Sequence, residues 1–220
     1  MEFADVLAAR HSCRAFTGEE VPEETLTELF ALAQRTPSWC NTQPWQVHLV
    51  SGQAAKRFST ELTEHVLAQP QSHDLEMPAG YSGVYAERRR ESGYALYEAV
   101  GVARDDKLAR GAQALLNYSF FGAPHVAVIT TDRDQGTYGA IDCGGYVATL
   151  TAAATSLGLG SIAQAALAMY SDKVRDFLGL PDDRLVVCGV SLGYADPEHP
   201  ANRFRTSRAS VGEVVTRVDE

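Results

Sequence analysis

The hydrophobic pattern of the first third of the chain changes from helical spacing to alternation and back again. Apolar residues recur every three or four positions near the N-terminus, and Pro22, Glu23 and Glu24 are typical of a helix start. Trp45, Val47 and Leu49 instead alternate with polar residues. The pattern therefore predicts helices over 3–7, 22–36 and 53–67, with a strand over 45–49 between the last two.

Residues 69–83 are rich in proline, glycine and polar side chains, which predicts a long loop, and long ordered loops are often functional. Beyond it the pattern predicts an irregular tail from Asp196, in which Val214 and Val215 mark a late strand or helix. The predicted elements in between are a basic helix around Arg88 to Arg90, helices over 105–120, 140–159 and 170–178, and strands over 126–130 and 185–191.

These helices and strands mix without a regular βαβ alternation. A mixed sheet packed between helices, an α+β fold, is therefore favoured over a doubly wound one. No linker or repeat divides the 220 residues, so we expect a single domain over 1–220. The helix over 140–159 is apolar but contains Asp142, so we expect it to be buried rather than membrane-spanning. Its small residues suit either a tight dimer or the chain's own core.

The chain carries 28 acidic and 19 basic residues, a formal net charge of −9. This charge disfavours general binding to nucleic acid or to an anionic membrane. The four cysteines form no Cys-x-x-Cys pair, and the N-terminus lacks a basic, apolar export signal, so we expect a cytoplasmic protein. The histidines show no ligand spacing, and we expect no metal.

Two short segments carry the chemistry. The first, Arg10-His11-Ser12-Cys13-Arg14, places two guanidinium groups and a hydroxyl on one stretch, a donor set that suits a phosphate and an electron-rich ring edge. The second, from Pro37 to Trp45, is a loop of polar donors held by prolines at both ends. Alone, the first would be read as a solvated basic turn and the second as a turn that orients a strand, with Trp45 serving mainly as core.

Together these segments resemble the FMN-dependent nitroreductase family, whose Arg-x-Ser-x-Arg/Lys and Pro-Ser-x-x-Asn-x-Gln-Pro-Trp elements are both present. The likeness extends along nearly the whole chain and is closest to the branch associated with nitrobenzoate reduction. It implies a mainly antiparallel sheet sandwiched between helices, in an intertwined homodimer with shared active sites. The C-terminal segment would then reach onto the partner subunit.

The resemblance also implies which residues bind the flavin. Residues matching Arg10 and Ser12 meet the phosphate or the ribityl chain, and the one matching Arg14 faces the pyrimidine end of the ring. The segment at Gln164 runs under the ring, and a basic residue of the tail joins the phosphate. The implied cofactor-binding residues are Arg10, His11, Ser12, Arg14, Pro37, Ser38, Trp39, Asn41, Gln43, Asn117, Ala163, Gln164, Ala165, Arg205 and Arg208. Trp39 and Cys40 stand where smaller residues are common in the family.

The implied activity is an oxidoreductase that takes hydride from NAD(P)H and reduces a nitroaromatic compound or a quinone by a ping-pong mechanism. The flavin carries the chemistry, so no catalytic side chain is expected. The alternatives are a flavin-storage or flavin-sensing protein, or a reductase of enones or halogenated aromatics. The basic run Arg88 to Arg90, with nearby tyrosines, is a candidate lid that attracts an acidic acceptor, although a solvated helix face explains the same residues.

Two other motifs match unrelated classes of protein. Residues 158–163 fit the loose dinucleotide pattern Gly-x-Gly-x-x-Ala, but that pattern needs a preceding strand, and a helix is predicted there. Residues 189–193 fit the Gly-x-Ser-x-Gly nucleophile elbow, but the following residues, which include Pro197 and Pro200, cannot form the helix that an elbow requires. We therefore expect neither a Rossmann domain nor a serine hydrolase.

Overall fold

A sheet of four strands lies at the centre of the computed structural model, which describes residues 1–219. Its strands run in the order β1-β2-β4-β3, and each pairs antiparallel with its neighbours. Ser12 adds a parallel bridge to Ser161 at the β3 edge. The expected α+β class with a mainly antiparallel sheet is therefore confirmed. The strands are β1 (Trp45–Ser51), β2 (His125–Asp132), β3 (Gly160–Gln164) and β4 (Arg184–Gly193).

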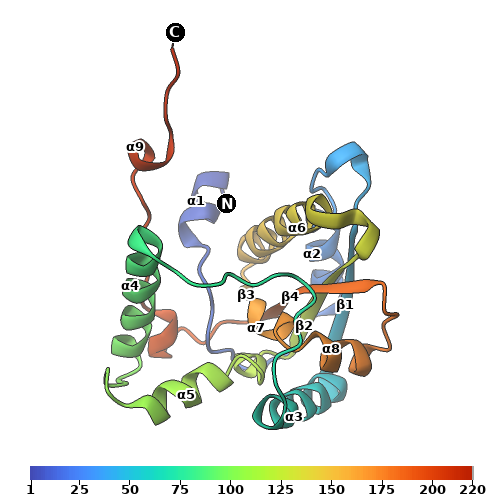
Figure 1. The fold of residues 1–220 in the computed structure, drawn as a ribbon, viewed down its shortest axis with the longest axis horizontal. Coiled ribbons are helices and arrows are strands. Elements are labelled where there is room, and N and C mark those ends of the chain that lie inside the picture. Colours follow the sequence, from blue (N-terminus) through green and yellow to red (C-terminus); the bar gives the residue numbers. More distant parts are fainter. Residues whose placement is uncertain (220) are drawn as a thin grey trace.

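Helices cover both faces of this sheet (Figure 1). One layer contains α2 (Glu23–Ala33) and α6 (Gly136–Ser156), and the other contains α3 (Gly52–Ala68), α7 (Ala165–Ala168) and α8 (Ser171–Leu178). Residues of β2 alternate between the layers: Ala127 and Ile129 pack with α2 and α6, whereas Val126 and Val128 pack with α3 and α8. The period of two in a strand thus builds two separate hydrophobic cores.

Two helices stand apart from these layers. Neither α4 (Gly83–Ala99) nor α5 (Lys107–Leu115) has a buried residue, and Figure 1 shows them beside the sheet. The first helix, α1 (Phe3–Ala9), lies between α4 and α6 in this view, and the short α9 (Val211–Val214) belongs to a tail that leaves from the α4 side. Four 3-10 turns complete the described elements: η1 (Trp39–Asn41), η2 (Phe120–Gly122), η3 (Arg133–Gln135) and η4 (Pro200–Asn202).

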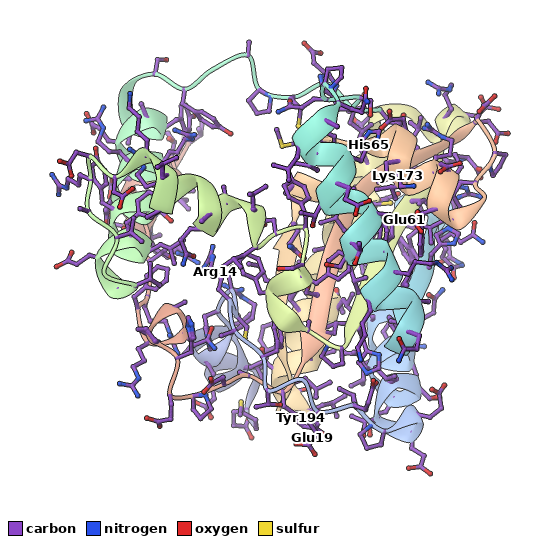
Figure 2. All side chains as sticks on the ribbon, turned by 90° about the horizontal axis from the view of Figure 1, so that it is seen from below. Arg14, Glu19, Glu61, His65, Lys173 and Tyr194 are labelled. Atoms are coloured by element: carbon purple, nitrogen blue, oxygen red, sulfur yellow. The ribbon has the colours of Figure 1, made fainter. Side chains whose placement is uncertain are left out.

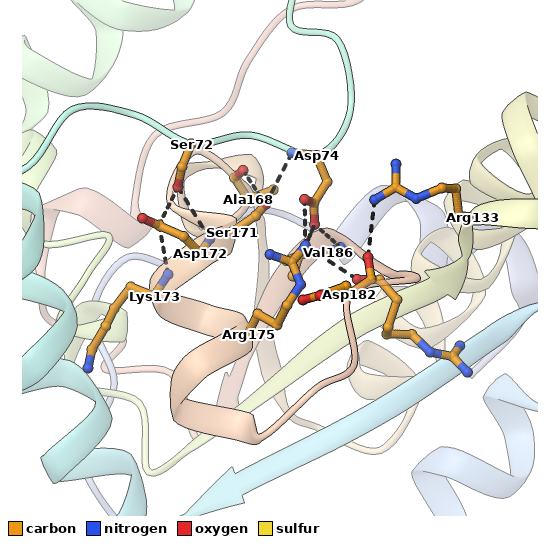
Figure 3. A network of polar contacts seen from close by, with 11 residues as sticks. Ser72, Asp74, Arg133, Ala168, Ser171, Asp172, Lys173, Arg175, Asp182 and Val186 are labelled. Carbon is orange, nitrogen blue, oxygen red and sulfur yellow. Dashed lines mark hydrogen bonds and ion pairs between the residues drawn. The ribbon is translucent and has the colours of Figure 1, made fainter.

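The predicted long loop crosses from α3 to α4 and is fastened at its start (Figure 3). Asp74 accepts hydrogen bonds from Arg175 at 2.6 and 2.7 Å and from the Val186 backbone N–H at 2.8 Å. Ser72 donates to Asp172 and also pairs with the backbone on both sides of Tyr170. Because Asp74 and Arg175 are both largely buried, this ion pair anchors the loop to α8 and β4.

The structure differs from the sequence prediction in four elements. The helix predicted over 105–120 spans Lys107–Leu115, after which tighter turn hydrogen bonds replace the helical pattern and the chain turns through positive φ at Phe120 and Phe121. β3 and α7 were not predicted. The helix predicted as buried over 140–159 spans 136–156 and buries only one face, since Ile141 and Tyr138 are exposed. Among the described residues, none of the helices is long and apolar enough to span a membrane.

Candidate functional site

The first motif runs along the β3 edge of the sheet. The Cys13 backbone N–H donates to the Ser161 carbonyl at 3.0 Å, next to the bridge between Ser12 and Ser161. A Cβ at Gly160 would lie 3.0 Å from Cys13 Sγ, so this close approach of two backbones favours glycine there. Burial raises the pKa of the Cys13 thiol. Cys13 is therefore an inert packing residue that holds Ser12 and Arg14 in place.

The buried amide of Asn202 helps to hold the tail against this segment, beside a backbone bond from Asp196 N–H to the Ala15 carbonyl. The Arg14 backbone N–H donates to Asn202 Oδ1 at 2.7 Å, and Asn202 Nδ2 donates to the carbonyls of Ala15 and Asp196, both at 2.8 Å. Asn202 lies within the turn η4, immediately before the tail arginines. The clamp thereby brings Arg205 and Arg208 to the N-terminal motif, nearly 200 residues away in sequence.

Both segments line a cavity of about 420 Å³. Four of its arginines have no carboxylate within 4.0 Å among residues 1–219, although the whole protein is acidic. Such a concentration of uncompensated positive charge is typical of an anion site. The lining residues are Leu7, Ala8, Arg10, His11, Ser12, Arg14, Ser92, Phe204, Arg205, Thr206 and Arg208.

Three of the four guanidinium groups of this cavity are held by neutral groups of the protein. Arg205 donates to the Asn202 and Phe204 carbonyls at 2.8 and 2.9 Å, and Arg208 donates to Thr206 Oγ1 at 2.7 Å. Arg14 donates to the Ser12 carbonyl and lies over the Phe204 ring. These contacts orient the side chains without cancelling their charge.

His11 contributes a neutral acceptor to the same cavity. Its Nδ1 lies 3.0 Å from the Ala9 carbonyl, which can only accept, so Nδ1 carries the hydrogen. Burial lowers the pKa of His11, and the positive charges of Arg205, Arg10 and Arg14 lower it further. Nε2 is then a lone-pair acceptor, and it is buried without a hydrogen-bond partner. A ligand hydroxyl would satisfy it.

A second cavity of about 280 Å³ adjoins the first through Arg14, which lines both. Figure 2 shows Arg14 between the helices α4 and α5 and the sheet. The predicted residues Asn117, Ala163, Gln164 and Ala165 meet here, at the end of β3. Burial lowers the pKa of Arg14, but a guanidinium stays charged. The remaining lining residues are Leu96, Tyr97, Gln113, Ala114, Phe121 and Ile162.

The side chain of Gln164 is engaged inside the protein. Its Nε2 donates to the Asn117 carbonyl at 2.8 Å, and its Oε1 accepts a hydrogen bond from Ser191 Oγ. Only the backbone of Gln164 is left for a ligand in this cavity. The sequence predicted Gln164 as a flavin-binding residue, and the structure places it in the cavity wall, but no pattern in the sequence indicated its internal hydrogen bonds.

The second motif lies elsewhere in the same chain. The loop after Pro37 lines a separate cavity of about 520 Å³ together with η3 and the start of α6. The Trp39 backbone N–H donates a hydrogen bond to the Asp142 carboxylate on α6. The Trp39 ring lies 4.3 Å from that of Tyr138, centroid to centroid. Within the loop, Gln43 N–H donates to Ser38 Oγ at 2.9 Å, and Gln43 Nε2 donates to the Asn41 carbonyl at 3.1 Å. A single chain therefore does not bring its two motifs together.

The structure agrees with the rejection of both decoy motifs. Gly158 follows α6, so helix precedes the glycine pattern and a strand follows it. Ser191 lies within β4, which continues to Gly193, and its hydroxyl is fully buried in a bond to Gln164. No group of three or more His, Cys, Asp or Glu that could hold a metal occurs in residues 1–219.

Sequence reasoning missed the apolar and small residues of the cavity walls. Phe204 had the best signal, since it is the apolar residue between Arg203 and Arg205 in a polar tail. Ser92, Leu96 and Tyr97 had none, because α4 shows no amphipathic pattern that marks one face.

Comparisons with known proteins agree with this geometry. The family model described as "Nitroreductase family" matches residues 7–194. The chain is 38% identical over 209 residues to nitroreductase NfnB of Mycolicibacterium smegmatis, which covers 94% of this chain and 89% of that protein. It is 34% identical over 223 residues to a 4-nitrobenzoate reductase of Nocardioides sp., covering 97% and 89% of the two chains.

Solved structures show the same likeness. A crystal structure described as an FMN and NADPH-dependent nitroreductase NfnB from sphigopyxis sp. strain HMH has a TM-score of 0.94 and 34% identity, with full coverage of both chains. FMN-dependent NfnB from Mycobacterium smegmatis in complex with NADPH has a TM-score of 0.92 and 38% identity, with 99% and 98% coverage. With a family model over most of its length and relatives above 30% identity, this chain belongs to the nitroreductase family.

Proposed function

We propose that this protein is an FMN-dependent oxidoreductase that uses NAD(P)H to reduce nitroaromatic compounds and acts as a homodimer. The observation that carries the proposal is the joined pair of cavities at Arg14. One end gathers Arg10, Arg205 and Arg208 without acidic partners, and the other is a smaller space beside Asn117. A phosphate at the first end and a polar ring edge at the second fit FMN.

The residues present fit the cofactor in a further respect. The buried Nε2 of His11 lacks a hydrogen-bond partner within the protein and would accept from a ribityl hydroxyl. Arg10, Ser12, Arg205 and Arg208 would hold the phosphate, and the backbone of Ala163 to Ala165 would lie beside the ring. When bound, FMN supplies the transfer of hydride between NAD(P)H and the acceptor.

The chain's own side chains would tune this chemistry. With FMN bound, the Arg14 cation would stabilise negative charge at the pyrimidine end of the ring and so favour the reduced cofactor. The hydrogen bond between Arg14 and the Ser12 carbonyl restricts the guanidinium, which lines the second cavity. We also propose ping-pong kinetics, in which co-substrate and acceptor occupy the same place beside the flavin in turn.

The separation of the two motifs supports the proposed homodimer. In a symmetric pair, the loop at Ser38 and Asn41 of one subunit would complete the cavities of the other. A second copy would pack on α4 and α5, which have no buried residues in the single chain. It would also pack on the face of α6 that exposes Gly144 and Ala148. The sphigopyxis and mycobacterial relatives are described with FMN and NADPH, which supports the same cofactor and co-substrate here.

The acceptor we propose is a nitroaromatic such as a nitrobenzoate, with quinones as a second substrate class. Arg88 of α4 lines a third cavity of about 450 Å³ with Arg205 and Arg208, against a single acidic lining residue, Glu91. Relatives named 4-nitrobenzoate reductase support a carboxylated acceptor.

The test is to purify the protein, release and identify its flavin, and follow NADH and NADPH consumption with a panel of acceptors. We expect a yellow protein with FMN and subunits in equal amounts, turnover that requires a nitroaromatic, and parallel double-reciprocal plots. A flavoprotein without turnover would support storage, and turnover with enones or halogenated aromatics alone would reassign the substrate. A colourless protein that ignores added FMN would overturn the proposal.

A further inference from the structure

A buried chain of hydrogen bonds connects the middle of the sheet to the wall of the second cavity. Ser191 lies on the central strand β4 and is fully buried, and Gln164 at the end of β3 is 2% exposed. Ser191 Oγ bonds Gln164 Oε1, and Gln164 Nε2 donates to the Asn117 carbonyl at 2.8 Å and to Asn117 Oδ1 at 3.3 Å. These three residues, which we call the amide relay, are far apart in sequence.

The relay has a fixed direction. The Ser191 hydroxyl can donate to Gln164 Oε1, and both bonds from Gln164 Nε2 end on oxygen atoms that accept. The oxygen of the Gln164 amide therefore faces Ser191 and its nitrogen faces Asn117. A rotated amide would place Nε2 against the hydroxyl and Oε1 against two acceptor oxygens, which is unfavourable in a buried site.

The same reasoning orients the amide of Asn117. Its Oδ1 accepts from Gln164, and its Nδ2 donates one hydrogen to the Ala114 carbonyl at 3.0 Å. Nδ2 has a second hydrogen, for which residues 1–219 provide no partner. Asn117 lines the second cavity, opposite the end of β3. The relay thus leaves an N–H donor of Asn117 available at the cavity.

We propose that Ser191 and Gln164 are positioning residues that make Asn117 present an N–H donor to the pyrimidine edge of the flavin. This inference rests on the proposed function. The carbonyl oxygens of that edge gain negative charge on reduction, so an aligned donor stabilises the reduced cofactor more than the oxidised one. The relay would therefore raise the midpoint potential of bound FMN although the side chains of Ser191 and Gln164 do not touch it.

The first experiment removes the donor at the start of the relay. In S191A, Gln164 Oε1 loses its bond and the amide is free to rotate away from Asn117. We expect a higher Kd for FMN and a midpoint potential lower by about 30 mV, a tenfold change in the two-electron equilibrium. The matched control is S171A, since Ser171, the first residue of α8, is equally buried and donates to the Ala168 carbonyl at the end of α7. Ser171 lines neither cavity, so S171A should lose stability without a shift in potential.

The second experiment replaces the middle of the relay and gives it a pH dependence. The carboxylate in Q164E accepts from Ser191 but cannot donate to Asn117, whereas its protonated form can. FMN binding, followed by fluorescence of the released flavin, should therefore strengthen as the pH falls, more than in the wild type. Arg14 and Tyr97 are the ionisable side chains lining the cavity, and the same titration of the wild type accounts for their contribution.

The outcomes separate the relay from the proposed function. If the wild type binds no FMN, the proposed function fails. If the wild type binds FMN but S191A keeps the wild-type potential and Q164E shows no added pH dependence, the relay is wrong and the proposed function stands. Should S191A fail to fold, the Q164E titration alone decides.

Discussion

At the scale of single residues, His125 shows how hydrogen-bond direction decides between chemistry and structure. The ring is 3% exposed, with Ser51 Oγ 2.7 Å from Nδ1 and Glu20 Oε2 3.3 Å from Nε2, an arrangement like a hydrolase triad. However, the Val21 backbone N–H donates to Nε2 at 3.2 Å, so in the neutral ring Nδ1 carries the hydrogen and donates to Ser51. The histidine cannot take a proton from the serine in this state.

His125 should make stability depend on pH. Burial lowers its pKa below the usual value of 6.5, although Glu20 and Glu23 act in the opposite direction. As the pH falls below about 6.5, the unfolded chain is protonated first, so the folded state loses stability by up to about 1.4 kcal/mol per pH unit. His11 and His48 have pKa values lowered by burial too and act the same way.

Urea unfolding of wild type and H125Q at a series of pH values checks this prediction. The free energy of unfolding of H125Q should be lower near neutral pH but should fall less steeply on acidification. Parallel pH profiles for the two proteins would contradict it.

At the scale of elements, α4 is unusual because it packs no buried side chain against the rest of the chain. None of its residues is buried, and its described links include an ion pair between Arg88 and Glu213 of α9 at 3.6 Å. Arg89 instead lies over the ring of Tyr81, and the Arg90 side chain has no hydrogen bond, ion pair or cation–π contact among the described residues. The candidate lid is thus a single arginine at a cavity rather than a basic run.

Replacing Arg88 should weaken binding of a carboxylated acceptor selectively. R88A removes a cation from the cavity that Arg205 and Arg208 share and leaves Glu213 uncompensated, so KM for 4-nitrobenzoate should rise about threefold to fivefold. Steady-state kinetics with 4-nitrobenzoate and nitrobenzene measure the difference, and R90A on the same helix is the control. An equal rise for both acceptors, or the same effect in R90A, would rule out this role.

The elements that the sequence predicted are those whose pattern is local. Leu26 and Leu29 lie on the buried face of α2 at helical spacing, and Pro22 precedes its first residue. β3 has no such signal, since Gly160 to Gln164 becomes a strand only by pairing with β4. The helix before Phe120 was predicted too long because its apolar spacing continues through a turn with positive φ.

The residues of the candidate site likewise divide into those that the sequence identified and contacts that only the structure reveals. Arg10, Arg14, Arg205 and Arg208 were identified by their residue types and by family resemblance, and the structure brings them to one cavity. The bond between Gln164 and Ser191 joins residues 27 positions apart and leaves no periodic trace in the sequence.

At the scale of the whole molecule, the separation of the two motifs makes a prediction about assembly. If each site uses Arg14 from one subunit and Asn41 from the other, a heterodimer of R14A and N41A chains carries one undamaged site and one doubly damaged site. Differently tagged chains, co-expressed and purified through both tags, should therefore recover FMN binding at wild-type affinity in half of their sites.

The matched control places both substitutions on one chain and pairs it with the wild type. With shared sites, each site of that heterodimer then lacks one residue, and no tight FMN site remains. If the control heterodimer binds FMN tightly in half of its sites and the R14A and N41A heterodimer binds none tightly, each subunit builds its site alone.

The backbone of the second motif has a consequence for evolution under selection. Cys40, Asn41 and Gln43 all have φ near +50°, a conformation that glycine adopts without penalty and other residues adopt at about 1 to 3 kcal/mol each. Glycine at these positions would relax the loop and delete the side chains that the motif supplies. Variants of this enzyme selected only for heat resistance would therefore tend to accumulate glycine at these three positions of one exposed loop and lose activity.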